Sequence, residues 1–244
     1  MILYLTSDPG GAWDNNGHPT ARPFKKENKF IYNLRKDIRE FAPHRRGRKC
    51  LIISAAPDNH QINDEHLAVF TKSFKRAWIL FDSIEMCDSR NPELVTKIND
   101  YSLVFLMGGH APTQNKFFKD IDLKKYIVSY NGILLTLSAG SMNCAKEVYM
   151  MPEEAEEFDI SISERLVPGL GLTTIQMVPH FQYLRTLEID GQKLIDDFVA
   201  GESIGMNFTG VCDGSYYRID TAKQESILYG EAYSISNKKI RPLS

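Results

Sequence analysis

Short, uniformly apolar runs alternate with amphipathic segments along this chain, and this alternation restricts the fold more than any other feature. Runs such as Cys50-Leu51-Ile52-Ile53 lack the polar and apolar alternation of a strand with one exposed face, so the predicted strands are buried on both faces. Between these runs, apolar side chains recur at helical spacing. Strand, crossover helix and strand in repetition predict an α/β fold, a three-layer α/β/α sandwich around a mostly parallel sheet.

The predicted elements cover most of the chain. The expected strands are 2–6, 49–55, 83–87, 102–107, 132–137 and 175–178, and the expected helices are 29–41, 66–80, 91–99, 112–129 and 191–200. From residue 203 onward the sequence is β-rich, with turn signals at Asp213-Gly214 and Asn237-Lys238. Because no Pro/Ser-rich linker and no repeat divides the sequence, we expect a single domain over residues 1–244 with a β-rich C-terminal extension.

Composition and charge exclude several classes of protein. With 43% hydrophobic residues, the chain can bury enough apolar surface to fold. Its 29 basic and 31 acidic residues give a net charge of −2, so no overall positive field is available for nucleic acid. No apolar run reaches the roughly 18 residues of a membrane span, and we expect a cytoplasmic protein without a membrane partner. The four cysteines are far apart and form no Cys-x-x-Cys pair, which predicts neither a metal site nor a disulfide framework.

Two small-residue motifs follow neighbouring predicted strands. Gly108-Gly109 comes directly after one buried run, and Ser138-Ala139-Gly140 comes directly after the next. In parallel sheets, ligands bind beyond the carboxyl ends of the strands, so both motifs lie where a site is expected. Glycines at a strand end also allow a backbone N–H to approach a substrate oxygen closely.

Ser138 has the sequence surroundings of a nucleophile elbow, a sharp turn between a buried strand and a helix. The Ala139 N–H would then point at a developing oxyanion, aided by the helix N-terminus. The usual Gly-x-Ser-x-Gly motif would have glycine where this chain has Thr136, and a tight turn without any chemistry fits the same residues. A serine nucleophile also needs a base, and His110 and His180 are the histidines that follow predicted strands.

Taken together, these motifs resemble those of the dipeptidase E family, also called the aspartyl dipeptidases or peptidase family S51, over about residues 2–219. The resemblance rests on the two glycine-containing motifs described above and on Pro179-His180-Phe181. It implies a class I glutamine amidotransferase-like, flavodoxin-like fold. It also implies that Ser138 is the nucleophile and that His180 is the general base. Backbone amides of Gly109 or Gly108 and of Ala139 would form the oxyanion hole, with no metal or organic cofactor.

The remaining site residues are also implied by this resemblance. The acidic segment between the serine and the histidine offers Glu153, Glu154, Glu156 and Glu157. The spacing in dipeptidase E implies Glu153 as the triad acid, and the spacing in its larger relative, cyanophycinase, implies Glu156 as the alternative. His110 and Arg185 are expected to bind substrate, and Arg165 is a second candidate for a substrate carboxylate. The chain departs from the family's usual Gly-Gly-Gly-Asn-Thr oxyanion loop, so catalysis carries over better than specificity.

The sequence therefore predicts a serine-type peptidase that hydrolyses short peptides through a Ser-His-Glu triad and an acyl-enzyme, with N-terminal Asp-Xaa dipeptides as candidate substrates. Two alternatives stay open. The same triad could hydrolyse another amide, an isopeptide or an ester, or the chain could be a non-catalytic, amidotransferase-like binding protein. An exposed β-rich C-terminal segment could also pair two copies as a homodimer.

Overall fold

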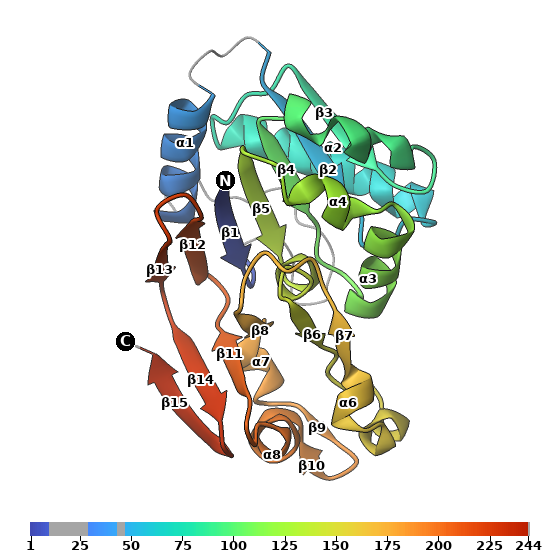
Figure 1. Cartoon of the computed structure of the whole chain (residues 1–244), viewed down its shortest axis with the longest axis vertical. Coiled ribbons are helices and arrows are strands. Elements are labelled where there is room, and N and C mark those ends of the chain that lie inside the picture. Colours follow the sequence, from blue (N-terminus) through green and yellow to red (C-terminus); the bar gives the residue numbers. More distant parts are fainter. Residues whose placement is uncertain (10–28, 43–46, 244) are drawn as a thin grey trace.

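The computed structural model describes residues 1–9, 29–42 and 47–243, and its centre is a seven-stranded sheet (Figure 1). The strand order is β13-β12-β1-β5-β4-β2-β3, in which the five strands from β1 to β3 are parallel and the other two are antiparallel. The strands are β1 Ile2–Thr6, β2 Lys49–Ile53, β3 Ser83–Cys87, β4 Leu103–Leu106, β5 Ile133–Leu137, β12 Tyr216–Asp220 and β13 Glu225–Tyr229. The predicted α/β fold with a mostly parallel sheet is confirmed.

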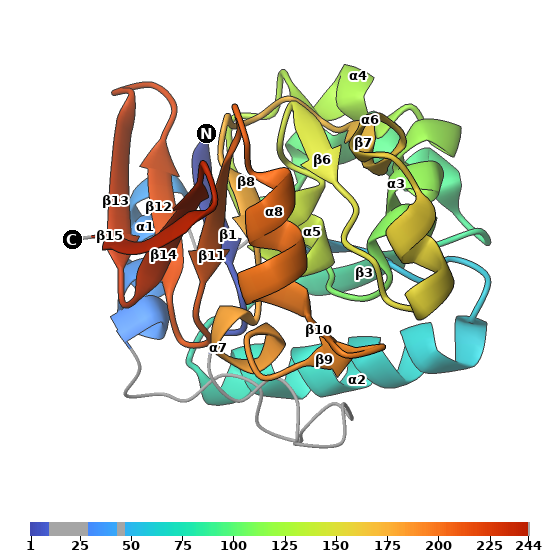
Figure 2. The same ribbon diagram turned by 90° about the horizontal axis from the view of Figure 1, so that it is seen from below.

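Helices cover both faces of this sheet, with α2 on the side opposite to α3 and α4 (Figure 2). One face packs against α1 Lys29–Phe41 and α2 His60–Arg76, and the other against η1 Pro92–Asp100, α3 Ala111–Asp120 and α4 Leu123–Ile127. Alternate residues of β1 belong to the two cores: Ile2 and Tyr4 to one, Leu3 and Leu5 to the other. This division explains why the strands are uniformly apolar.

A second sheet, of four strands, lies beside the central one (Figure 1). Its order is β15-β14-β11-β8, with β8 and β11 parallel and the other pairs antiparallel. The strands are β8 Gln176–Val178, β11 Asn207–Val211, β14 Ala232–Ser236 and β15 Lys239–Leu243. The additional C-terminal β-structure is confirmed, but β12 and β13 join the central sheet, because β12 pairs with β1 over five residues.

The remaining elements are short. They are α5 Ala139–Met142, β6 Glu147–Tyr149, η2 Ala155–Asp159, α6 Ile162–Arg165, β7 Leu166–Pro168, α7 Phe181–Leu184, β9 Glu188–Ile189, β10 Gln192–Lys193, η3 Leu194–Val199 and α8 Ala200–Glu202. In the described ranges, no helix combines the length and apolarity that crossing a membrane requires.

Three predicted helices differ from the observed ones by more than one residue at an end. The helix expected at 66–80 is α2, which begins six positions earlier because the Asn59 side chain caps it by accepting the Ile62 N–H. The helix expected at 112–129 is divided into α3 and α4 at Asp122, whose φ is 50°. The helix expected at 191–200 starts at Leu194, because β9 and β10 form a small hairpin before it.

Candidate active site

Ser138 lies in a sharp turn between β5 and α5, with φ 47° and ψ −110°. Such angles are unfavourable for a residue with a Cβ and persist only where the surroundings enforce them. The Ser138 N–H donates to the carbonyls of Thr6 (3.0 Å) and Ser7 (3.1 Å), at the end of the neighbouring strand β1. This geometry is that of a nucleophile elbow, in which the hydroxyl stands above the carboxyl edge of the sheet.

Thr136, which replaces the first glycine of the usual elbow motif, faces a buried polar cluster. Its hydroxyl donates to the Tyr4 carbonyl (2.8 Å) and shares a hydrogen bond of 2.6 Å with the Ser141 hydroxyl. The Ser141 hydroxyl also accepts the Thr6 N–H at 3.0 Å. These bonds join β1, β5 and α5 immediately behind Ser138, so threonine holds the elbow in place where other elbows use glycine.

His180 stands opposite Ser138, because it follows β8 at the corresponding edge of the second sheet. Its Nε2 is 2.9 Å from the Ser138 Oγ, and its Nδ1 is 2.8 Å from Asp213 Oδ1. A carboxylate accepts only, so Nδ1 carries the proton and Nε2 is free to accept the serine O–H. Ser138, His180 and Asp213 therefore have the arrangement of nucleophile, base and orienting acid.

The acid beside His180 is Asp213, whereas the sequence predicts Glu153. Glu153 and the alternative Glu156 are exposed, and the Glu153 N–H donates to the Glu157 carboxylate at 2.6 Å. An imidazole N–H makes one strong hydrogen bond, and that of His180 is made to Asp213.

Asp213 reaches His180 because β8 and β11 are parallel neighbours, with Gly210 opposite Val178. His180 and Asp213 each follow their strand by two positions, so they emerge side by side. The sequence carries one usable signal, an acidic residue two positions after the strand Asn207–Val211. Taken alone, Asp213-Gly214 indicates only a turn, because strand pairing is not visible in one sequence.

Three hydrogen bonds hold the Asp213 carboxylate. Besides His180, the Ser7 hydroxyl donates to Oδ1 (2.6 Å) and the Gln182 amide donates to Oδ2 (2.7 Å). Burial by itself raises the pKa of Asp213, but the hydrogen bonds from His180, Ser7 and Gln182 outweigh it, and the pKa is lowered below its ordinary value. The carboxylate is therefore ionised at neutral pH.

The loop after β4 lies beside the elbow and presents backbone donors. In the part of the chain that the structure describes, the N–H groups of Gly109 and Ala139 donate to no protein acceptor. Gly109 has φ +153°, and a Cβ there would lie 2.8 Å from the Cβ of Ala55, so this position requires glycine. A Cβ on Gly108 would lie 3.3 Å from the Ser138 Cβ, which shows how closely the loop approaches the serine.

The predicted substrate-binding residues have partners of their own. His110 is exposed and caps α3, with its Nδ1 2.7 Å from the Thr113 hydroxyl. Arg185 pairs with Asp196 at 2.8 Å and lies over the Phe181 ring. The other candidate, Arg165, is 3% exposed and pairs with Glu202 at 3.4 Å, so its charge belongs to the interior of the protein.

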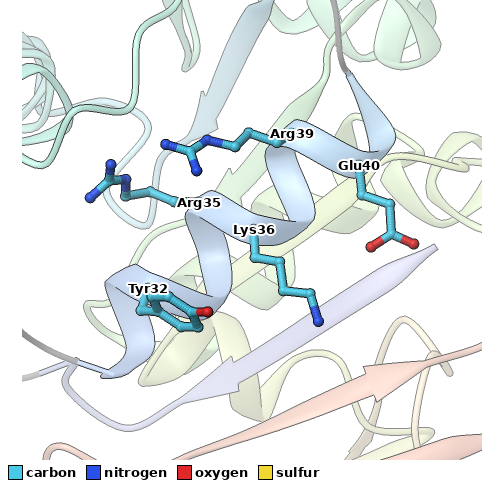
Figure 3. A pocket seen from close by; sticks show the side chains of 5 residues that line it. All are labelled: Tyr32, Arg35, Lys36, Arg39 and Glu40. Carbon is cyan, nitrogen blue, oxygen red and sulfur yellow. The ribbon is translucent and has the colours of Figure 1, made fainter.

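Other features of the described residues lie apart from the triad. The pocket in Figure 3 is lined by side chains of α1 alone and contains no triad residue. Its lining residues are Tyr32, Arg35, Lys36, Arg39 and Glu40. Within the described ranges, no cluster of three His, Cys, Asp or Glu side chains could hold a metal ion. The four cysteines are buried and unpaired, and burial raises the pKa of each thiol.

Two solved structures share the fold. A peptidase from an acI-B1 Actinobacterium has a TM-score of 0.68 and 16% identity, with 100% of this chain and 93% of that chain covered. A candidate peptidase E protein from Listeria monocytogenes EGD-e has a TM-score of 0.57 and 16% identity, with 93% of this chain and 97% of that chain covered. No curated protein sequence matches this chain. The model of peptidase family S51 matches residues 24–227, most of the chain, and the protein therefore belongs to this family.

Proposed function

We propose that this protein is a serine peptidase that cleaves short peptides through an acyl-enzyme on Ser138. Membership of peptidase family S51 supports a peptidase activity. The observation that carries the proposal is the chain of hydrogen bonds from Ser138 to His180 (2.9 Å) and from His180 to Asp213 (2.8 Å). Both distances are within the range required for proton transfer and for orientation of the base.

In the first half of the reaction, the Ser138 Oγ attacks the carbonyl carbon of the scissile peptide bond while His180 Nε2 accepts the hydroxyl proton. The carbonyl oxygen becomes an oxyanion, which accepts hydrogen bonds from the N–H groups of Ala139 and of Gly109 or Gly108. The C–N bond then breaks, and His180 returns the proton to the leaving amine. Asp213 keeps the Nδ1 proton in place and stabilises the transient imidazolium.

In the second half, His180 deprotonates a water molecule, which attacks the acyl carbon on Ser138. The same backbone amides stabilise the second oxyanion. Collapse of this intermediate releases the carboxylic acid product, and His180 returns the proton to the Ser138 oxygen.

We propose N-terminal Asp-Xaa dipeptides as the first substrates to test, with His110 and Arg185 as the substrate-binding side chains. Arg185 is 42% exposed and lies at the end of α7, the short helix that begins directly after His180. Recognition of a substrate carboxylate there would share the guanidinium with Asp196. His110 follows the Gly108-Gly109 loop directly and is the second polar side chain that we propose to bind substrate.

The proposal is tested with Ser138→Ala. We expect the wild-type protein to react with a fluorophosphonate at Ser138 and to hydrolyse members of a dipeptide panel. The variant should lose labelling and about 10⁴-fold or more of turnover, while its circular dichroism spectrum stays unchanged, because the nucleophile is absent but the fold is intact.

Three results would contradict this assignment. They are a Ser138→Ala protein as active as the wild type, wild-type labelling at another serine, and wild-type protein that does not react at all. Hydrolysis of isopeptides or esters without any dipeptide activity would support Ser138 as the nucleophile but would show that the proposed substrate class is wrong.

A further inference from the structure

We infer that Ser7 is a positioning residue that holds all three members of the triad in register across the junction of the two sheets. The inference rests on the proposed function of Ser138, His180 and Asp213. It assigns to Ser7 no contact with the substrate.

Ser7 contacts each triad residue through a different bond. Its carbonyl accepts the Ser138 N–H at 3.1 Å. Its hydroxyl accepts the backbone N–H of His180 at 2.7 Å and lies 2.6 Å from Asp213 Oδ1. A backbone N–H can only donate and a carboxylate can only accept, so the single hydroxyl proton of Ser7 is given to Asp213.

These bonds cross the boundary between separately paired sheets. Ser138 follows β5 of the central sheet, whereas His180 and Asp213 follow β8 and β11 of the second sheet. Ser7 itself follows β1, the strand beside β5, and in sequence it is 173 residues from His180 and 206 from Asp213. The distance between nucleophile and base therefore depends on contacts at this boundary and not on one continuous ladder of strands.

The Ser7 side chain is shielded from water, because the residue is fully buried. Its two partners are more open, since the side chains of Asp213 and His180 are each 32% exposed. A hydrogen bond in such surroundings is stronger than one in water, and a solvent molecule does not easily replace it. Without the hydroxyl, the His180 N–H loses its acceptor and Asp213 loses one of its donors.

Gln182 supports Asp213 in a different way. Its amide donates to Asp213 Oδ2 (2.7 Å) and its carbonyl accepts the Asp213 N–H (2.9 Å). Gln182 lies two residues from His180, so it fixes the acid relative to the base within the second sheet. Among the described residues that hydrogen-bond Asp213 or His180 from outside the triad, only Ser7 also bonds to Ser138. For this reason we assign the alignment of the two sheets at the triad to Ser7.

The experiment removes the Ser7 hydroxyl with Ser7→Ala and, at nearly constant volume, with Ser7→Cys. Ser7→Thr restores a hydroxyl. Ser73→Ala is the matched control, because the Ser73 hydroxyl is also fully buried but donates to the Val69 carbonyl inside α2. The readouts are the rate of fluorophosphonate labelling at Ser138, kcat and KM for the best dipeptide, and the NMR signal of the hydrogen-bonded His180 Nδ1 proton.

We expect Ser7→Ala and Ser7→Cys to lower kcat and the labelling rate by about tenfold to a hundredfold, because misplaced catalytic groups cost this much. KM should change little, since no substrate contact is removed. The downfield His180 Nδ1 proton should broaden or disappear in both variants. Ser7→Thr should recover most of the rate and the signal, and Ser73→Ala should keep both at the wild-type level.

A folded Ser7→Ala or Ser7→Cys protein with the wild-type labelling rate, or with an unchanged His180 proton, would overturn the inference. An equal loss in Ser73→Ala would do the same, because the effect would then be general destabilisation. If Ser7→Ala does not fold, Ser7→Cys decides. Wild-type protein that labels at Ser138 but cleaves no peptide would refute only the proposed substrate. Wild-type protein that does not label would refute the proposed function. In that case the NMR signal of the His180 Nδ1 proton would still decide the role of Ser7.

Discussion

Ser138 and His180 both have positive φ angles, 47° and 52°, which residues with a Cβ rarely adopt. In each case the backbone N–H donates to residues at the end of β1. The Ser138 N–H donates to the carbonyls of Thr6 and Ser7, and the His180 N–H donates to the Ser7 hydroxyl. The strain of two turns is thus compensated at one strand end. Residues in such conformations gather at functional sites, because surrounding contacts are needed to keep them there.

The identity of the triad acid gives the prediction at this scale. Asp213→Asn should lower kcat about 10³- to 10⁴-fold, because an amide does not enforce the tautomer in which His180 Nε2 accepts the serine proton. Glu153→Gln is the matched substitution, and it should leave kcat unchanged since Glu153 is exposed and does not contact His180. Steady-state hydrolysis of a dipeptide measures both. A large loss of kcat in Glu153→Gln, together with an active Asp213→Asn variant, would show that Glu153 is the triad acid.

At the scale of elements, the elbow and the end of β4 are packed backbone against backbone. A Cβ on Gly140 would lie 2.5 Å from the Leu106 carbonyl oxygen and 2.8 Å from the Met107 carbonyl oxygen. No flexible side chain is available there to move aside. The glycine in Ser138-Ala139-Gly140 therefore lets the first turn of α5 approach β4, the strand that leads into the Gly108-Gly109 loop.

This packing predicts that Gly140→Ala lowers the free energy of unfolding by about 1–3 kcal/mol, the usual cost of overpacking. It should also slow fluorophosphonate labelling, because Ser138 and the Gly108-Gly109 loop are pushed apart. Gly201→Ala is the control, since a Cβ at this position in α8 meets nothing within 4 Å. Urea unfolding should show that variant to be as stable as the wild type or slightly more so. Equal stability of the two variants would show that the structure yields at Gly140 without strain.

Across the whole molecule, buried polar networks connect the loops at the carboxyl edge of the central sheet. Asp88, after β3, is fully buried and pairs with Arg90 at 2.7 Å. The Asn63 amide of α2 donates to Asp88 (3.1 Å), and its carbonyl accepts the Ser54 hydroxyl (2.7 Å) after β2. These loops lie directly behind Gly109, whose added Cβ would meet Ala55. These networks thus support the Gly108-Gly109 loop from the side away from Ser138.

The ionisation of Asp88 predicts how this support depends on pH. Burial raises the pKa of Asp88, but hydrogen bonds from Arg90 and Asn63 outweigh it and lower the pKa below its ordinary value. A carboxylate with a lowered folded pKa contributes stability that is present above its unfolded pKa of roughly 4 and is lost as pH falls through the folded pKa. Asp88→Asn should therefore lower the free energy of unfolding at pH 7 by about 2 kcal/mol.

The same argument sets the comparison at low pH. The difference between wild type and Asp88→Asn should shrink when urea unfolding is repeated near pH 3, because the unfolded wild-type chain binds a proton at Asp88 below its unfolded pKa of roughly 4 and folding must then release it. Glu156→Gln, an exposed position, serves as the control and should show no difference at either pH. A difference for Asp88→Asn that stays constant from pH 7 to pH 3 would rule out the ionised carboxylate as its cause.

The limits of sequence-based prediction follow from the range of the interactions concerned. Helix 29–41 and strands 2–6 and 83–87 were predicted with their observed bounds, because apolar periodicity is a local property. The strand pattern singles out Ser138 and leaves His110 and His180 as candidate bases, the family resemblance points to His180, and the structure places its Nε2 2.9 Å from the Ser138 Oγ. The homodimer and the single-domain organisation stay predictions.

By itself, the sequence determined the uniformly buried strands, the helices between them and the two glycine-containing turns, and so the fold class and the edge of the sheet where a site had to lie. Only the tertiary structure decided that Asp213 and Ser7 belong to this site. Their places depend on which strands lie side by side, β8 with β11 and β1 with β5, and on contacts between residues as far as 206 positions apart. Such pairings minimise the free energy of the whole chain, and no local pattern of residues encodes them.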